Sequence, residues 1–185
     1  MSTPWNVSLP TTLTAGGEEH AIRSDYRAAL DIFLALTDPE LDDFNRSMEL
    51  LDILYVDDIP PEHWQEAIDR GFWFLNGGEP ERDVKQPPVV NWEKDFNLIA
   101  APISKIVGQD IRGVEYMHWW TFLQCYQSIG DCLFAQIVRI RDKKARGKAL
   151  DKADQEFYRR NRDLIDLKTV YTEQDNEILK QWGGG

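Results

Sequence analysis

The stretch Glu115-Tyr116-Met117-His118-Trp119-Trp120-Thr121-Phe122-Leu123 decides the fold predicted for this chain of 185 residues. Two adjacent tryptophans, followed by Phe122 and Leu123, place a large and rigid apolar area on one face of a helix. Such an area is normally buried in a core or against a partner, and no catalytic apparatus requires it. The stretch therefore predicts a helical domain that is held together by packing.

The apolar pattern continues beyond this cluster as far as Arg141. Its members follow one another at alternating steps of four and three residues: Trp119, Leu123, Tyr126, Gly130, Leu133, Ile137 and Ile140. This spacing predicts one helix over about 114–141 that packs along a neighbouring helix, and Gly130 would allow a close approach there. The neighbour belongs either to the same chain or to a second molecule, so a homo-oligomer remains open.

Upstream of the aromatic cluster, the pattern changes from extended to helical. Gly16-Gly17 between two short extended runs predicts a β-hairpin over residues 5–23. Apolar residues at helical spacing then predict four helices, over about 25–37, 41–55, 61–75 and 91–107. The apolar faces of the first and fourth of these carry Tyr26, Ala29, Leu30, Phe33 and Leu34, and Trp92, Phe96, Ile99, Ile103 and Ile106.

Capping and breaking residues support these boundaries. Asp38-Pro39 separates the first two helices, and Asn76-Gly77-Gly78 ends the third. Gly108 ends the fourth helix, in which Pro102 is expected to cause a kink. Asp151 can cap a charged helix that runs to about residue 167, and a further short helix is expected near Thr172.

The chain is expected to form a single domain over residues 1–185. Its parts are the hairpin 5–23, a helical part 24–76, a Gly- and Pro-rich linker 77–90 and a helical part 91–182. The terminal glycines 183–185 form a flexible tail, a cloning remnant or a strand captured by a partner. The predicted fold is mainly α: an orthogonal or antiparallel bundle of about six helices with a short N-terminal β-hairpin.

Charge is unevenly distributed in this acidic chain, whose net charge is −11. Residues 1–110 hold 21 acidic and 8 basic side chains, whereas residues 111–185 hold 11 and 13. An acidic first part repels nucleic acid, so no nucleic-acid partner is expected. A basic patch near the end of the long helix is interpreted as a solvated helix terminus, with phosphate contact or an acidic protein partner as alternatives: Arg139, Arg141, Lys143, Lys144, Arg146 and Lys148.

No apolar run approaches the length of a membrane-spanning helix, and the first ten residues lack the features of a signal peptide. We therefore expect a soluble intracellular protein with no membrane partner. Cys125 and Cys132 lie seven residues apart on the predicted long helix, about 10 Å by the helical rise, which is too far for an unstrained disulfide. Both are expected to be buried thiols.

The sequence contains no familiar catalytic or cofactor-binding motif: no Gly-rich phosphate loop, no nucleophile elbow, no His-Glu-x-x-His and no paired CxxC. The acidic pairs Asp42-Asp43 and Asp57-Asp58 are interpreted as solvated or capping residues. His118 could be a base in an aromatic pocket, but a packed histidine that bonds to Glu115 or to a backbone carbonyl explains it better. We expect no enzymatic activity, no cofactor and no metal.

Several short motifs follow one another in a distinctive order. They are Ser24-Asp25-Tyr26-Arg27, Leu50-Leu51-Asp52-Ile53-Leu54-Tyr55, Asp58-Ile59-Pro60, Phe72-Trp73-Phe74-Leu75-Asn76-Gly77-Gly78, Trp92-Glu93-Lys94-Asp95 and Met117-His118-Trp119-Trp120-Thr121-Phe122. This order resembles a bacteriophage family, the gene-product-fifteen proteins of tailed phages and prophages, over roughly residues 7–170. The run from His118 to Phe122 is the most specific of these motifs.

The resemblance implies a function that composition and spacing do not. Proteins similar to this one are usually encoded between the major tail protein and the tape measure protein of long-tailed phages. That position implies a tail assembly chaperone, which works in the host cytoplasm and binds the tape measure protein and other tail proteins. Two alternatives remain: a structural tail component that stays in the virion, and a metal-dependent nuclease or hydrolase.

A long apolar helix as partner requires an apolar groove on the chaperone. The candidate partner-binding residues are Trp64, Phe72, Trp73, Trp119, Trp120 and Phe122. Every one of them could instead belong to the core, and Trp119 is the strongest core candidate. Trp73 is the best surface candidate, because Trp64, Ile68, Phe72 and Leu75 would already fill the inward face of their helix.

Overall fold

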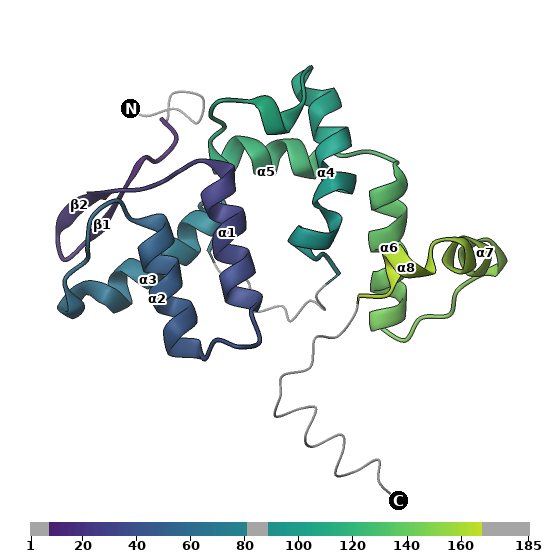
Figure 1. Ribbon diagram of the computed structural model, residues 1–185, viewed down its shortest axis with the longest axis horizontal. Helices are drawn as coiled ribbons and strands as arrows, with labels where there is room; N and C mark the ends of the chain where they lie inside the picture. Colours follow the sequence, from purple (N-terminus) through teal and green to yellow (C-terminus); the bar gives the residue numbers. More distant parts are fainter. Residues whose placement is uncertain (1–7, 81–88, 168–185) are drawn as a thin grey trace, which may run out of the picture.

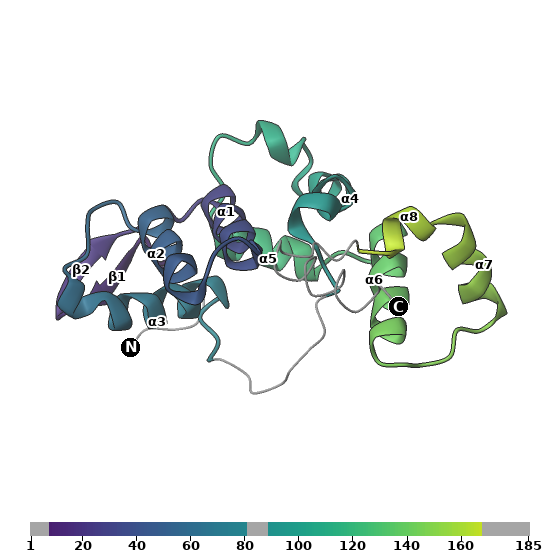
Figure 2. The ribbon, with the colours of Figure 1, turned by 60° about the horizontal axis from the view of Figure 1, so that its bottom comes forward.

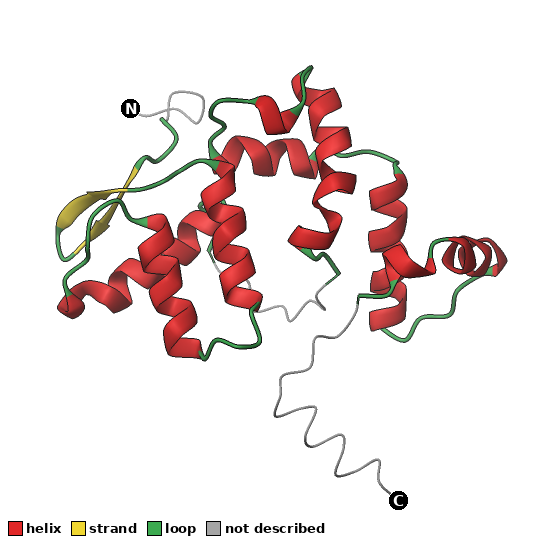
Figure 3. Ribbon diagram, in the orientation of Figure 1, coloured by secondary structure: helices red, strands yellow, loops and turns green. Residues whose placement is uncertain are grey.

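The computed structural model describes residues 8–80 and 89–167, and the structural statements below concern these residues. It is mainly helical, as predicted, with one two-stranded hairpin (Figures 1 and 3). The strands are β1 (Thr12–Ala15) and β2 (Glu18–Ala21). The α-helices of the described part are α1 (Tyr26–Thr37), α2 (Asp43–Leu54), α3 (Trp64–Leu75), α4 (Trp92–Val107), α5 (Trp119–Gln127), α6 (Leu133–Ala145), α7 (Lys152–Arg160) and α8 (Arg162–Ile165).

The predicted hairpin is confirmed. Thr12 pairs with Ala21 and Ala15 with Glu18 in an antiparallel ladder. Gly16 and Gly17 make the turn with φ angles of 62° and 81°, a conformation that glycine adopts without steric cost. Leu13 and Ala15 are buried, and β1 packs against α3.

Most helix starts follow from a polar residue that caps them. The side chains of Asp25, Asp42, Asn91 and Asp151 accept hydrogen bonds from backbone N–H groups in the first turns of α1, α2, α4 and α7. A 3₁₀ turn, Pro61–His63, leads into α3. Gly108 ends α4 with a φ of 82°, as predicted.

The single helix predicted over about 114–141 is wrong, because the structure divides it into two helices. Residues before α5 are extended: the N–H of Tyr26 bonds to Met117 O, and the N–H of Trp119 bonds to Ser24 O. His118 then caps α5, since its Nδ1 accepts the N–H of Trp120 at 3.0 Å. Tertiary pairing with the segment before α1 therefore overrides the helical pattern at this end.

A second interruption separates α5 from α6. Ser128 Oγ donates to Gln124 O at 2.7 Å and ends α5, and Cys132 Sγ accepts the N–H of Ala135 at 3.5 Å and begins α6. A Cβ on Gly130 would meet nothing within 4 Å, so the predicted close approach at this residue is also wrong. Cys125 and Cys132 are free thiols on either side of the break, and both are half-buried.

The main core lies among the hairpin and helices α1 to α5. Tyr26 and Phe122 stack with their ring centroids 4.9 Å apart, and Trp119 stacks on Phe122 at 5.5 Å. All three are essentially inaccessible to solvent. The aromatic run that predicted the fold thus supplies the centre of this core.

A second and smaller cluster of buried residues consists of Ile137, Ile140 and Ile165, from α6 and α8. Figure 2 shows α6, α7 and α8 at one end of the molecule, with α4 between them and the rest. Leu98 of α4 packs against both clusters. Within the described ranges, no helix is long and apolar enough to cross a membrane.

Some predicted features fall on residues whose structure is not described. These are the start of the hairpin range, residues 81–88 of the predicted linker, the short helix near Thr172 and the tail 183–185. They stay predictions.

Candidate partner-binding grooves

The six predicted partner-binding residues lie in four different environments. Trp119 and Phe122 have no exposed surface, so the core alternative applies to both. Trp119 Nε1 donates to Leu75 O at 2.9 Å and ties α5 to the end of α3. A partner could reach these two rings only if the core opened.

Trp73 and Trp120 meet at the seam between α3 and α5. Their ring centroids are 5.4 Å apart with the planes at 70°, and both side chains are half-buried. Trp120 Nε1 donates to Phe74 O at 2.8 Å. Gly78 fits against this pair because it lacks a side chain. A Cβ at this position would lie 2.7 Å from Trp120 Cη2. The seam is a closely packed contact with one solvent-facing edge.

The expected inward face of α3 is partly wrong. Phe72, expected inside, is 39% exposed, whereas Phe74, which the predicted face omitted, is completely buried. The buried face consists of Ala67, Gly71, Phe74 and Leu75. Helix α2 approaches closely at Gly71, where a Cβ would lie 2.6 Å from Leu50 Cδ2. Which aromatic side chains of α3 are covered depends on where α2 and the hairpin lie. The sequence of α3 alone does not encode those positions.

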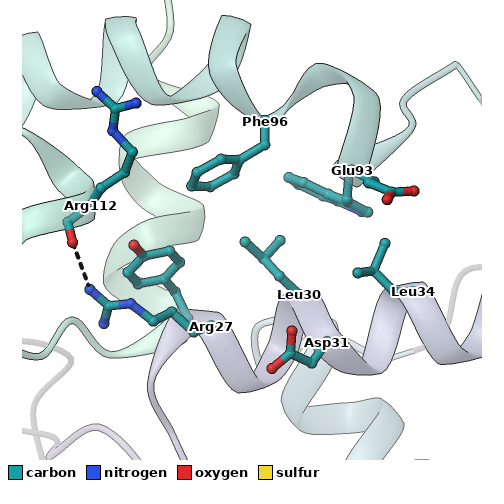
Figure 4. A pocket seen from close by; sticks show the side chains of 9 residues that line it. Arg27, Leu30, Asp31, Leu34, Glu93, Phe96 and Arg112 are labelled. Atoms are coloured by element: carbon teal, nitrogen blue, oxygen red, sulfur yellow. Dashed lines mark hydrogen bonds between the residues drawn. The ribbon is translucent and has the colours of Figure 1, made fainter.

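An apolar groove lies between α1 and α4 (Figure 4). We name it the α1–α4 groove; its volume is about 500 Å³. Leu30 and Leu34 of α1 face Phe96 of α4 across it, and Leu34 is 40% exposed. The complete lining is Tyr26, Arg27, Leu30, Asp31, Leu34, Trp92, Glu93, Phe96 and Arg112.

The two arginines of the α1–α4 groove are already paired within the chain. Arg27 Nη1 lies 3.0 Å from Asp25 Oδ1, and its Nη2 donates to Val114 O at 2.6 Å. Arg112 binds Asp110 at 2.7 Å, and its hydrogen bonds lower the pKa of that carboxyl to about 2. Both cations are therefore held in place at one end of the groove.

The two carboxylates of the α1–α4 groove, Asp31 and Glu93, form no ion pair with any described residue. Partial burial raises the pKa of Asp31 above its ordinary value. Glu93 lies beside Leu34 at the end of the groove opposite the arginines. The groove thus offers apolar walls and two free acceptors for a cation.

Sequence reasoning missed this groove although it identified its residues. Leu30 and Leu34, like Trp92 and Phe96, are i, i+4 pairs on faces that the periodicity assigned to the core. The structure packs α1 against α2, α4 and α5, and the remaining edges of these faces stay uncovered. No sequence signal separates the covered from the uncovered part of such a stripe.

A second groove, of about 530 Å³, lies between α2, the following loop and the start of α3; we name it the α2–α3 groove. Met48, Ile59 and Trp64 provide apolar lining, and Trp64 Nε1 donates to Ile59 O at 2.8 Å. Tyr55, also in the lining, donates its hydroxyl to Ala67 O, and burial raises its pKa to about 12. The acidic lining residues are Glu49, Asp52, Asp57 and Asp58.

His118, which was considered as a catalytic base, has a structural role. His118 caps α5 through Nδ1, and its Nε2 lies 2.9 Å from Pro10 O, so the ring carries its proton on Nε2. The prediction of a packed histidine bonded to a backbone carbonyl is confirmed. Among the described residues, no group of three or more His, Cys, Asp and Glu side chains could hold a metal ion.

The prediction that the basic patch is solvated is wrong for Arg141, whose exposed fraction is 5%. Its Nη2 lies 3.0 Å from Asp95 Oδ1, and Asp95 is 1% exposed. Arg141 also donates to Val89 O and Ile165 O, so it joins α4, α6 and α8. This contact fixes the C-terminal helices to the remainder of the molecule.

Comparison with known proteins gives one match. The family model described as Bacteriophage Gp15 protein matches residues 6–167. Curated proteins and solved structures gave no match.

Proposed function

The chain belongs to the bacteriophage Gp15 protein family, and from that membership we propose that it is a tail assembly chaperone that binds the tape measure protein during tail morphogenesis. The family suggests a structural or tail-region protein of a phage. The proposed site of action is the host cytoplasm, where tail proteins are made. Other tail proteins are further proposed partners.

The observation that carries the proposal is the α1–α4 groove. An amphipathic helix binds a partner by laying apolar side chains at i, i+3 and i+4 positions into such a groove. Leu30, Leu34 and Phe96 offer apolar walls from two helices, and Trp92 adds a large aromatic surface. Burial of this area against a partner helix would remove it from water and drive association.

The charges of the α1–α4 groove restrict the kind of helix that it would bind. Because Arg27 and Arg112 are neutralised within the chain, the free charges in the groove are those of Asp31 and Glu93. A bound helix with a lysine or arginine beside its apolar stripe would pair with them. The proposed tape measure segment is therefore apolar on one side and basic near one end.

Co-expression with the tape measure protein encoded by the same phage tests the proposal. The wild type should keep the tape measure protein soluble and co-purify with it, and Leu34→Asp should abolish both effects. Ile106→Asp is the matched control, because Ile106 is 46% exposed on α4 and does not line the groove. Loss of binding in both variants, or in neither, would contradict a role for the groove.

Trp73→Ala belongs in the same experiment, because Trp73 was the surface residue favoured by the sequence. Retained binding in Trp73→Ala with loss in Leu34→Asp would assign the partner to the α1–α4 groove. Loss only in Trp73→Ala would move the proposed site to the seam between α3 and α5.

The alternative role, a structural component retained in the particle, makes a different prediction. Purified virions should then contain the protein in a fixed ratio to other tail proteins, whereas a chaperone should be absent from them. We propose no enzymatic function, cofactor or metal. An unchanged melting temperature in magnesium or manganese would support that absence, since a bound ion stabilises the folded state by mass action.

A further inference from the structure

Charge is separated along the long axis of the molecule. Residues 8–80, from the hairpin to the end of α3, carry sixteen acidic and four basic side chains, whereas residues 133–167 carry six acidic and ten basic ones. Figures 1 and 2 place the hairpin, α2 and α3 at one end and α7 at the other. The acidic end of one molecule is therefore electrostatically complementary to the basic end of a second copy.

The acidic end has a shaped surface in the α2–α3 groove. Glu49 and Asp52 lie one turn apart on α2, and Asp57 and Asp58 follow in the loop. Within the ranges 8–80 and 89–167, none of the four forms an ion pair. Phe44, whose ring centroid lies 6.4 Å from that of Trp64, is 61% exposed. The groove combines these carboxylates with one cation, Arg23, which donates to the backbone oxygens of Asp52 and Ile53, and an exposed aromatic ring lies beside it.

The basic end presents one face of α7. The inner face of this helix carries Asp154, Phe157 and Tyr158, which are buried or half-buried. Lys152 and Arg159 lie seven residues apart on the outer face, about 10 Å along the helix axis, and both are exposed. In the described part of the chain these two form no ion pair.

Most other cations at this end are already engaged; the exception is Lys148, which is exposed in the loop before α7. Arg139 lies 2.8 Å from Asp154, and Lys143 bonds to the same carboxylate. Lys144 binds Asp166, and Arg160 binds Glu156. Among the described residues of this end, the unpaired positive charge therefore lies on the outer face of α7 and at Lys148 shortly before it.

We propose that α7 of one copy docks into the α2–α3 groove of a second copy, so that the chain associates head to tail. Lys152 and Arg159 pair with the carboxylates of the groove, and the aliphatic stem and guanidinium of Arg159 lie on the Phe44 and Trp64 rings. Since the two surfaces lie at opposite ends, the contact is heterologous. Copies add one after another until a ring closes or an open chain grows.

The association follows charge and is sensitive to salt. Exposed ion pairs are individually weak and lose strength as the Debye length shortens from about 10 Å at 0.1 M to about 3 Å at 1 M. We expect oligomers at about 50 mM NaCl, and about tenfold weaker association at about 500 mM NaCl. This self-association does not depend on the proposed chaperone function.

Sedimentation velocity of the full chain, with two charge-reversal variants, tests the proposal. E49K/D52K cancels the net charge of the four groove carboxylates, and K152E/R159E reverses the charge of the outer face of α7; circular dichroism checks that both fold. Each variant alone should be monomeric at low salt. Their equimolar mixture should associate again, because the unaltered groove of one variant matches the unaltered α7 of the other. The lysines introduced into the groove can also pair with the glutamates introduced into α7.

The control E115K/D131K changes two exposed acids outside the groove and shifts the net charge as much as E49K/D52K does. It should associate like the wild type. A monomeric wild type at low salt, persistent association of either variant alone, failure of the mixture to associate, or equal loss in the control would each overturn the proposal.

Discussion

The two ends of the molecule hold their helices together by different means. From the hairpin to α5, large aromatic side chains fill the core, and Tyr26, Trp119 and Phe122 are almost completely removed from water. The C-terminal helices α6 to α8 bury only three apolar side chains in their own cluster and depend on charged contacts such as Asp95–Arg141 and Asp154–Lys143. Aromatic packing resists changes of salt and pH, whereas a region held by ion pairs responds to both.

The largest expected effect comes from the aromatic core. Trp119→Ala should lower the free energy of unfolding by about 3–5 kcal/mol, because it leaves a cavity and an unpaired Leu75 carbonyl. Urea denaturation followed by tryptophan fluorescence and circular dichroism measures this change. Phe72→Ala is the aromatic control and should cost far less, because Phe72 is 39% exposed. Equal costs at the two positions would refute the account of the core.

Removal of the buried Arg141 side chain tests how the C-terminal helices α6 to α8 are held. Arg141→Ala leaves Asp95 buried without its partner and should cost about 3 kcal/mol. The effect should appear as faster hydrogen exchange in α6 to α8, while α1 to α3 keep their protection. Replacement of both partners by apolar residues, Asp95→Leu with Arg141→Met, should restore part of the loss. A uniform rise in exchange along the chain would show that the two regions unfold as one.

Acid should loosen the C-terminal helices first. Hydrogen bonding by Lys143 lowers the pKa of Asp154. Burial alone would raise the pKa of Asp166, but the hydrogen bonds from Lys144, Tyr158 and Arg162 together outweigh it and lower that pKa. A carboxyl with a lowered pKa stabilises the fold above its unfolded pKa of about 3.9, and this contribution disappears as the pH falls through the folded pKa. Below about pH 4 we therefore expect progressive loss of helix in α6 to α8.

Two spectroscopic signals separate the regions in such an acid titration. Residues 133–167 contain no tryptophan, whereas Trp64, Trp73, Trp92, Trp119 and Trp120 lie elsewhere in the described part. The far-ultraviolet circular dichroism signal should fall at a higher pH than the one at which tryptophan fluorescence changes. Coincident transitions would remove the distinction between the two regions.

The smallest expected effect concerns the start of α6. Cys132 caps this helix with a sulfur atom, which is a weak acceptor, and the bond to Ala135 N is 3.5 Å long. Cys132→Ser should stabilise the protein by about 0.5 kcal/mol, because serine is a preferred capping residue. The melting temperature measures the change, and Cys125→Ser, which caps no helix, is the control. A larger gain from Cys125→Ser would contradict the capping role of Cys132.

Local signals predicted much of the fold. Gly16-Gly17, the cap Asp151 and the stop at Gly108 act within a few residues, so sequence alone locates them. The break between α5 and α6 escaped prediction because Leu133, Ile137 and Ile140 continue the apolar spacing of α5 across it. Those isoleucines serve a different cluster, and a periodic pattern does not say which partner it packs against.

The candidate site was less predictable for the same reason. The sequence identified the aromatic residues, but their exposure depends on elements distant in the chain, such as α2 against Gly71 or the segment of Ser24 against Trp119. Trp119 and Phe122 proved to be core, and the α1–α4 groove lies where α1 and α4 leave Leu34 exposed and Phe96 half-buried.

Hydrogen exchange of the protein with and without the tape measure protein tests the central claim most directly. The account predicts new protection confined to the helix segments that form the α1–α4 groove, around residues 27–34 and 92–96. Leu34→Asp should abolish that protection, and Ile106→Asp should retain it. Absence of a complex, or protection only outside these two segments, would contradict the proposal that this groove holds the tape measure helix.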